Sequence, residues 1–234
     1  MNIKTIKTSS GKLNRIIHLA DIHIRLYKRQ KEYKEVFKEL YKDIKNIFQK
    51  GDIIVIAGDI HHSKIEMTPE SISLISDFFK KLADITDVVI IPGNHDANLN
   101  NLKRLDALSP IIKTLNNSKI HYLKNTGLYR LDNVVFSVMG VFEKYDEYIP
   151  ASNIPDEYVK IALFHGPVQG SYTDTGYKIS NKKMNVTFFN GYDIVLLGDI
   201  HKRQTLQEYE IESMFIDENE LEKYLNYGWK IKKD

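Results

Sequence analysis

Residues 52–62 read DIIVIAGDIHH, and this stretch decides the fold. An apolar run over 53–57 ends at a glycine, and Asp59 and two histidines follow it. Such runs, bounded by Gly, Asp or Asn, are typical of strands that are buried on both faces. The pattern recurs as RIIHLADIH (15–23), VVIIPGNHD (88–96), IALFHG (161–166) and IVLLGDIH (194–201). Ligands bind at the carboxyl ends of the strands in layered α/β folds, so we expect these polar residues to gather along one rim of a sheet.

The residue types at the five strand ends are aspartate, asparagine and histidine. Two divalent cations a few ångströms apart require oxygen and imidazole ligands of this kind, with a carboxylate shared between them. A single Asp-Ile-His or Gly-Asp-Ile is a common turn and predicts little by itself. Five such motifs, each at the end of a predicted strand, predict a dinuclear metal centre.

In this order the motifs resemble the signature of the calcineurin-like metallophosphoesterases, which runs Asp-x-His, Gly-Asp, Gly-Asn-His-Asp/Glu, His and Gly-His-x-His. The resemblance extends from Asp21 to His201. It implies that His95 is the catalytic imidazole and that Asp96 orients it. The metal ligands that it implies are Asp21, His23 and His201 for one ion, Asn94 and His165 for the other, and Asp59 as the bridge.

One position departs from this signature. Asp199 follows Gly198 where the family usually has a histidine, so we expect a carboxylate ligand at the second metal. Carboxylates suit hard cations such as Mn²⁺ and Mg²⁺. The expected cofactors are therefore two divalent metal ions, Mn²⁺ first, with Mg²⁺, Fe²⁺ and Zn²⁺ as alternatives.

Within the family the chain looks most like the exonuclease branch that includes bacterial SbcD and the double-strand-break repair nuclease. That branch has a second functional histidine three residues after the bridging aspartate, which here is His62. The resemblance implies a dinuclear phosphodiesterase that acts on nucleic acid, as a DNA exonuclease or endonuclease in DNA repair. Two alternatives stay open. One is a small-substrate phosphoesterase acting on a monoester or a cyclic or nucleotide diester, and the other is a non-catalytic binding scaffold with a degraded second metal site.

The fold class that the family resemblance implies is α/β, a two-sheet β-sandwich flanked by helices in four layers, α/β/β/α. Apolar residues at three-and-four spacing predict a helix over 33–48. Thr68-Pro69 and Ser109-Pro110 predict two helix starts, and Asp132-Asn133 between apolar runs predicts a hairpin. We expect a metallophosphoesterase domain over 1–209 and an atypical tail over 210–234. The Tyr-Pro-Gly-Ser stretch of the repair branch is absent, so the C-terminus reads as truncated.

Composition narrows the class of protein. The 234 residues contain no cysteine, which excludes disulfides and cysteine-ligated metals. The sequence has no apolar signal segment and no apolar stretch of about eighteen residues, so we expect a cytoplasmic protein that is not in a membrane.

The net charge of +2 gives no overall attraction to nucleic acid. Basic residues instead follow the motifs, and the residues that we expect to contact phosphates are Arg25, Lys28, Arg29, Lys202 and Arg203.

The expected partners follow from the same resemblance. DNA is the expected substrate, and a homodimer is expected as an alternative to a monomer. The resemblance also implies an SbcC-like ATPase as a possible partner, and we expect the region that docks it to be missing. The polar segment 166–185, directly after His165, reads as a surface loop that could gate or contact the substrate.

Overall fold

The computed structural model of the protein describes residues 2–9, 11–180, 184–202, 204 and 206. The chain divides into two units, residues 1–204 and 205–234, and all of the elements below belong to the first. The expected domain boundary at residue 209 and the atypical tail lie outside the described residues, so both stay predictions.

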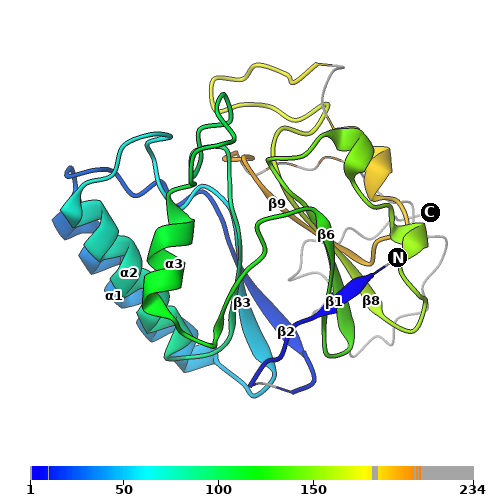
Figure 1. The fold of residues 1–234 in the computed structure, drawn as a ribbon, viewed down its shortest axis with the longest axis horizontal. Coiled ribbons are helices and arrows are strands. Elements are labelled where there is room, and N and C mark those ends of the chain that lie inside the picture. The colour runs from blue at the N-terminus through cyan, green and yellow to red at the C-terminus, as the bar shows by residue number, and fades with distance from the viewer. Residues whose placement is uncertain (1, 10, 181–183, 203, 205, 207–234) are drawn as a thin grey trace, which may run out of the picture. The chain divides into compact units, whose positions relative to one another are not determined.

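Two sheets form the centre of the first unit (Figure 1). The five-stranded sheet has the order β1 (Ile3–Thr5), β6 (Gly127–Leu131), β7 (Val134–Met139), β8 (Val159–His165) and β9 (Ile194–Gly198). The four-stranded sheet has the order β2 (Arg15–Leu19), β3 (Asp52–Ala57), β4 (Val88–Ile91) and β5 (Ile120–Tyr122). Among these strands only β6 and β7 are antiparallel, and they form the hairpin predicted around Asp132-Asn133.

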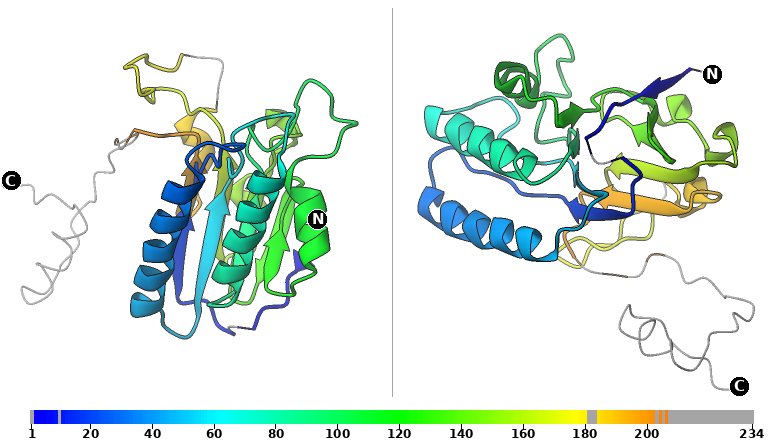
Figure 2. Two further views of the ribbon diagram at one scale, coloured as in Figure 1. Left: turned by 90° about the vertical axis from the view of Figure 1, so that its left-hand side faces the viewer. Right: turned by 90° about the horizontal axis from the view of Figure 1, so that it is seen from below.

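Helices cover the outer face of the four-stranded sheet. They are α1 (Gln30–Ile47), α2 (Pro69–Ala83) and α3 (Leu108–Leu115), and Figure 2 shows them side by side along the strands. Near the outer face of the five-stranded sheet lie short 3-10 helices, η1 (Tyr145–Glu147), η2 (Ala151–Asn153) and η3 (Val186–Phe189). The predicted fold class, α/β with two sheets flanked by helices, is confirmed.

The side chains of β3 explain why its sequence is apolar throughout. Ile54 and Ile56 pack against the helices, whereas Ile53, Val55 and Ala57 pack between the two sheets. This alternation buries both faces, as predicted, because successive side chains of a strand point to opposite faces. At the sheet edges the same prediction was wrong. Strands β2 and β9 each pair with a single neighbour and are only partly buried.

The carboxyl ends of β2, β3 and β4 in one sheet meet those of β8 and β9 in the other. The backbone N–H of Asp199, after β9, donates to the carboxylate of Asp21, after β2, at 3.0 Å. Similarly, the ring of His165, at the end of β8, lies 2.7 Å from the carbonyl oxygen of Ala57, at the end of β3. Both sheets therefore contribute to a single rim. In the part of the chain that the structure describes, no helix is long and apolar enough to span a membrane.

Candidate metal centre

The backbone takes unusual conformations where the strands reach the rim. The angle φ is +56° at Asp21, +50° at His23, +54° at Asp59 and +68° at Asp199, a region that residues other than glycine seldom adopt. Hydrogen bonds between the strand ends hold these turns, for example from the His23 N–H to the Asp59 carbonyl oxygen at 2.9 Å. Such strained residues persist where the surrounding structure fixes them, and they cluster at functional sites.

Two glycines, Gly93 and Gly198, have no side chain where the side chains of Asp59 and His165 lie. A Cβ atom added to Gly93 would lie 2.1 Å from Asp59 Oδ1, and one added to Gly198 would lie 2.3 Å from His165 Nδ1. Both distances are shorter than real Cβ contacts, so a larger residue would displace Asp59 or His165. The glycines of the sequence motifs therefore permit close approach of backbone and ligand side chain.

The first group that could hold a metal ion consists of Asp21, His23 and His201, whose ligand atoms lie within 4.8 Å of one another. His201 Nε2 is 3.7 Å from Asp21 Oδ1, and His23 Nε2 is 3.6 Å from Asp59 Oδ2. Both ring nitrogens of His23 and Asp59 Oδ2 are buried and, among the described residues, lack a hydrogen-bond partner. Buried polar atoms nearly always have partners, so these orphaned atoms fit ligands of a cation.

The second group consists of Asp21, Asp59 and His165. Because a carbonyl oxygen can only accept, the His165 Nδ1–H donates to Ala57 O, and Nε2 faces Asp59 Oδ1 at 3.2 Å and Asn94 Oδ1 at 3.1 Å. Burial alone would lower the pKa of His165, but the Asp59 carboxylate outweighs burial and raises it to about 9. Metal binding replaces protons on such ligands, so the proton that His165 holds beside Asp59 marks a place suited to a divalent cation.

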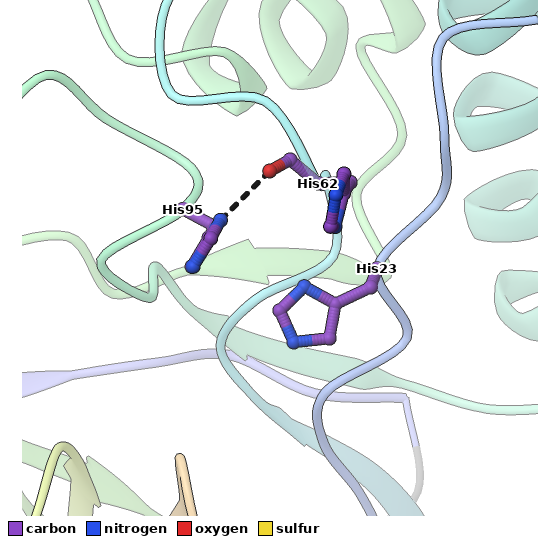
Figure 3. Close-up of side chains that lie close together, drawn as sticks. All are labelled: His23, His62 and His95. Atoms are coloured by element: carbon purple, nitrogen blue, oxygen red, sulfur yellow. Dashed lines mark hydrogen bonds between the residues drawn. The ribbon is translucent and has the colours of Figure 1, made fainter.

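A third group consists of three imidazoles, His23, His62 and His95 (Figure 3). The His23 ring centroid lies 5.0 Å from that of His95 and 5.5 Å from that of His62. The rings of His62 and His95 stack, with centroids 5.7 Å apart. His95 Nδ1 bonds to the His62 carbonyl oxygen at 2.7 Å, and the His95 backbone N–H donates to Asp59 Oδ1 at 2.8 Å. The structure thus brings both histidines with predicted catalytic roles to the metal-ligating residues.

Asp96 was predicted to orient the His95 ring, but its carboxylate bonds to backbone groups of other residues. Its carboxylate is fully buried and accepts the backbone N–H groups of His61 and Gly93, each at 2.8 Å. The carbonyl oxygen of His62, not Asp96, bonds to the His95 ring. Burial raises the pKa of the Asp96 carboxyl to about 7. Asp96 therefore fastens the chain after β3 to the chain after β4, and it contributes to the site by holding those backbones together.

Asp199 contacts the site through its backbone. Its N–H donates to both carboxylate oxygens of Asp21, at 3.0 and 3.2 Å. Its own carboxylate belongs to none of the three groups that the described residues form. Burial raises the pKa of the Asp199 carboxyl, and the nearby carboxylates of Asp59 and Asp21 raise it further. Direct coordination of a metal by this carboxylate stays a prediction.

The basic residues near the rim are exposed. Arg25 is close enough to His62 to lower the pKa of that histidine, after the larger effect of burial. Lys28 and Lys202 are exposed, and Arg29 forms an ion pair with Glu32. Arg203 lies outside the described residues. Contacts of these residues with nucleic acid stay predictions.

A loop after β8 contributes residues that the sequence patterns did not predict. Asp174 Oδ2 lies 3.2 Å from His201 Nδ1, the ring nitrogen on the far side from Asp21. The side chain of Gln204 accepts from the Tyr172 N–H at 2.7 Å and donates to the Tyr172 carbonyl oxygen at 2.9 Å. The loop is thereby fastened to the segment that carries His201. Its place directly after His165 was the only signal in the sequence.

Comparison with known proteins gives three further findings. The model of the family described as calcineurin-like phosphoesterase matches residues 14–203. The uncharacterized protein R555 of Acanthamoeba polyphaga mimivirus is 46% identical over 217 residues, which cover 88% of this chain and 16% of that protein. The chain thus spans about a sixth of that relative. A crystal structure of the Pseudomonas putida nuclease MPE is similar at 18% identity and a TM-score of 0.31, over 63% of this chain and 58% of that one.

Proposed function

We propose that this chain, which belongs to the calcineurin-like phosphoesterase family, is a metal-dependent phosphodiesterase that cleaves nucleic acid. Membership implies a hydrolase of phosphoester bonds that uses divalent metal ions. The finer proposal is a DNA exonuclease or endonuclease with a role in DNA repair. The observation that supports it most is a rim on which two carboxylate-histidine groups adjoin the stacked imidazoles of His62, which is exposed, and His95, which is half-buried.

Exposure along the rim favours a long substrate. Asp59 and His165 are buried at the base of the site, whereas the side chain of His201 is 42% exposed and His62 is exposed. A polymer must reach the reacting atoms while its two ends extend into solvent. An arrangement with buried ligands at one side and exposed imidazoles at the other meets that need.

The residues divide the chemistry between them. Asp21, His23 and His201 would hold one cation, Asn94 and His165 the other, and Asp59 both. When bound, two divalent cations neutralise charge on phosphate oxygens and make attack by water feasible near neutral pH, so the chain needs no nucleophilic side chain. The His95 Nδ1–H donates to the His62 carbonyl oxygen, which leaves Nε2 for the substrate. When the ring carries a second proton, as an imidazolium, Nε2–H would give that proton to the leaving oxygen. We propose Mn²⁺ as the metal.

One observation favours an alternative, the non-catalytic scaffold. The carboxylate of Asp199 belongs to none of the three metal-ligating groups within the described residues. If the second site depends on that carboxylate, it would bind its ion weakly. The number of ions bound therefore separates the enzyme from the scaffold.

The test is degradation of end-labelled linear DNA by metal-stripped protein to which Mn²⁺ is returned. We expect cleavage by the wild type and its loss in Asp59→Asn and in His95→Ala. His121→Gln is the matched control, because His121 bonds to Asp87 and not to the site. Intact DNA with hydrolysis of a chromogenic phosphodiester would favour the small-substrate enzyme. Intact DNA with fewer than two bound ions would favour the scaffold.

The remaining partners stay predictions. Light scattering at several protein concentrations tests the homodimer, and co-purification tests the SbcC-like ATPase. Localisation in the cytoplasm is likewise a prediction.

A further inference from the structure

Five lysines lie along one line of α1, at positions 31, 34, 38, 42 and 45. Intervals of three and four residues keep them on one side of the helix, and all five are exposed. The acidic residues of the helix, at 32, 35, 39 and 43, follow the same intervals one position later and form a separate line. The two signs of charge therefore form adjacent lines on the helix. We call the first line the lysine stripe, and at 1.5 Å per residue it is about 21 Å long.

The C-terminal part of the stripe borders a hollow between α1 and the C-terminal end of α2. The hollow has a volume of about 520 Å³, and its walls carry Lys38, Lys42 and Lys45 from α1 and Lys81 from α2. Tyr41 also lines it, with Lys81 Nζ 5.5 Å from the centre of its ring. Asp84 is the one acidic residue among the lining side chains. The hollow thus presents several ammonium groups to one ligand.

Most of these ammonium groups lack a carboxylate partner. Within the part of the chain that the structure describes, Lys42 pairs with Glu39 at 3.3 Å, and no carboxylate lies within 4.0 Å of Lys38, Lys45 or Lys81. The Lys42 pair is itself about two-thirds exposed and is worth little in water. The charges are therefore available to an anionic partner.

The stripe starts beside the candidate metal centre. The Tyr33 hydroxyl, in the first turn of α1, donates to the carbonyl oxygen of His23 at 2.7 Å. The Gln30 side chain donates to the carbonyl oxygen of Arg25. Figure 2 shows α1 running from this end along the outer face of the four-stranded sheet. A linear polyanion that enters the metal centre could continue along the stripe.

We propose that the lysine stripe and Lys81 bind the phosphate backbone of a nucleic acid on one side of the bond that is cut. The ligand's identity rests on the proposed function, whereas the surface rests on the charges of α1 and α2. A membrane surface fits less well, because an interfacial helix presents an apolar face and the apolar residues Phe37 and Ile44 of α1 are buried against the sheet.

The test is the binding of a labelled 30-base-pair DNA, measured by fluorescence anisotropy in EDTA so that no cleavage occurs. The variant carries Lys38→Gln, Lys42→Gln and Lys45→Gln. The matched control carries Lys4→Gln, Lys7→Gln and Lys113→Gln, which remove the same charge from exposed lysines outside α1 and α2. Each lost phosphate contact lowers the slope of log K against log[salt] by about 0.9. We expect the stripe variant to lose two to three units of slope and to bind at least about tenfold more weakly at 0.1 M salt.

Equal affinities of the two variants, with unchanged circular dichroism, would overturn the inference. So would retained DNA binding with loss of binding to vesicles of phosphatidylserine, because the stripe would then serve a membrane. Hydrolysis of a chromogenic phosphodiester separates this inference from the proposed function. The stripe variant should hydrolyse it at the wild-type rate, since that substrate is too short to reach α1. If wild-type protein binds DNA through the stripe but does not cut it, the proposed function fails and the inference stands.

Discussion

Replacing Asp174 with alanine should weaken one of the two proposed metal sites while leaving the other unchanged. Asp174 Oδ2 meets His201 Nδ1 at 3.2 Å, and His201 Nε2 faces Asp21 in the first metal-ligating group. A carboxylate on the far nitrogen of a ligand histidine fixes the tautomer, orients the ring and increases its basicity. Without that carboxylate, His201 would present Nε2 to a cation for only part of the time.

The structure sets the expected size of the effect. Loss of such outer partners typically costs 10–100-fold in metal affinity. Asp174 and His201 have side chains that are 63% and 42% exposed, so water screens their interaction. The 3.2 Å separation is also long for a hydrogen bond to a charged group. We therefore expect the lower end of that range, about tenfold, or about 1.4 kcal/mol.

Isothermal titration of the metal-stripped protein with Mn²⁺ measures this effect without any substrate. We expect one binding step to weaken about tenfold in Asp174→Ala and to disappear in His201→Ala. Asp174→Glu should restore much of the affinity. Asp156→Ala is the control, because Asp156 is an exposed aspartate that forms an ion pair with Lys160. An unchanged titration of Asp174→Ala beside a clear loss in His201→Ala would refute the reasoning.

Two further predictions concern the rim and the opposite end of the sheet. Gly93→Ala should abolish tight metal binding, because the new Cβ would lie 2.1 Å from Asp59 Oδ1 and 2.3 Å from the Asp59 backbone nitrogen, and wild-type affinity by titration would contradict this. Asp87→Asn should lower the free energy of unfolding by about 1–3 kcal/mol at pH 7 in urea. Burial opposes ionisation of Asp87, but hydrogen bonds from His121 and Ser9 hold its pKa below the ordinary 3.8. The stability that the ionised Asp87 contributes is therefore present above pH 3.8 and is lost as the pH falls through the lowered pKa. A deficit that persisted at pH 2 would argue against that cause.

The features that the sequence predicted well are those determined by local pattern. The apolar run before Asp59 forms a strand that is buried on both faces, as its residue types predicted. Thr68 caps α2 directly before Pro69, also as predicted. The start of α3 was predicted less well. Asp106, and not Ser109, accepts the first N–H groups of that helix, those of Leu108 and Ser109. Asp106 also forms an ion pair with Lys124, which is distant in sequence. The position of the cap of α3 therefore depends on a tertiary contact.

The features that sequence reasoning missed depend on contacts between distant segments. The left-handed φ of Asp21 and Asp59 cannot be read from the residue type, because both are usually found at negative φ. The position of Asp96 beneath two backbone segments follows from how those segments meet. The approach of Asp174 to His201 is set by the path of a loop, for which no periodic pattern exists.

Because both sheets contribute to the rim, metal binding there would also stabilise the contact between the two sheets. Asp59 extends from one sheet and His165 from the other, so an ion held by both would fasten the two halves of the sandwich in a chain that has no disulfide. At an ion concentration a hundredfold above its Kd, that clasp would add about 2.7 kcal/mol to the free energy of unfolding. Chelation should then loosen the sandwich first at the rim, where β2 and β9 end and each has only one neighbouring strand. The amide groups of those two strands should exchange with solvent faster once the metal is removed, whereas those of β3 should not.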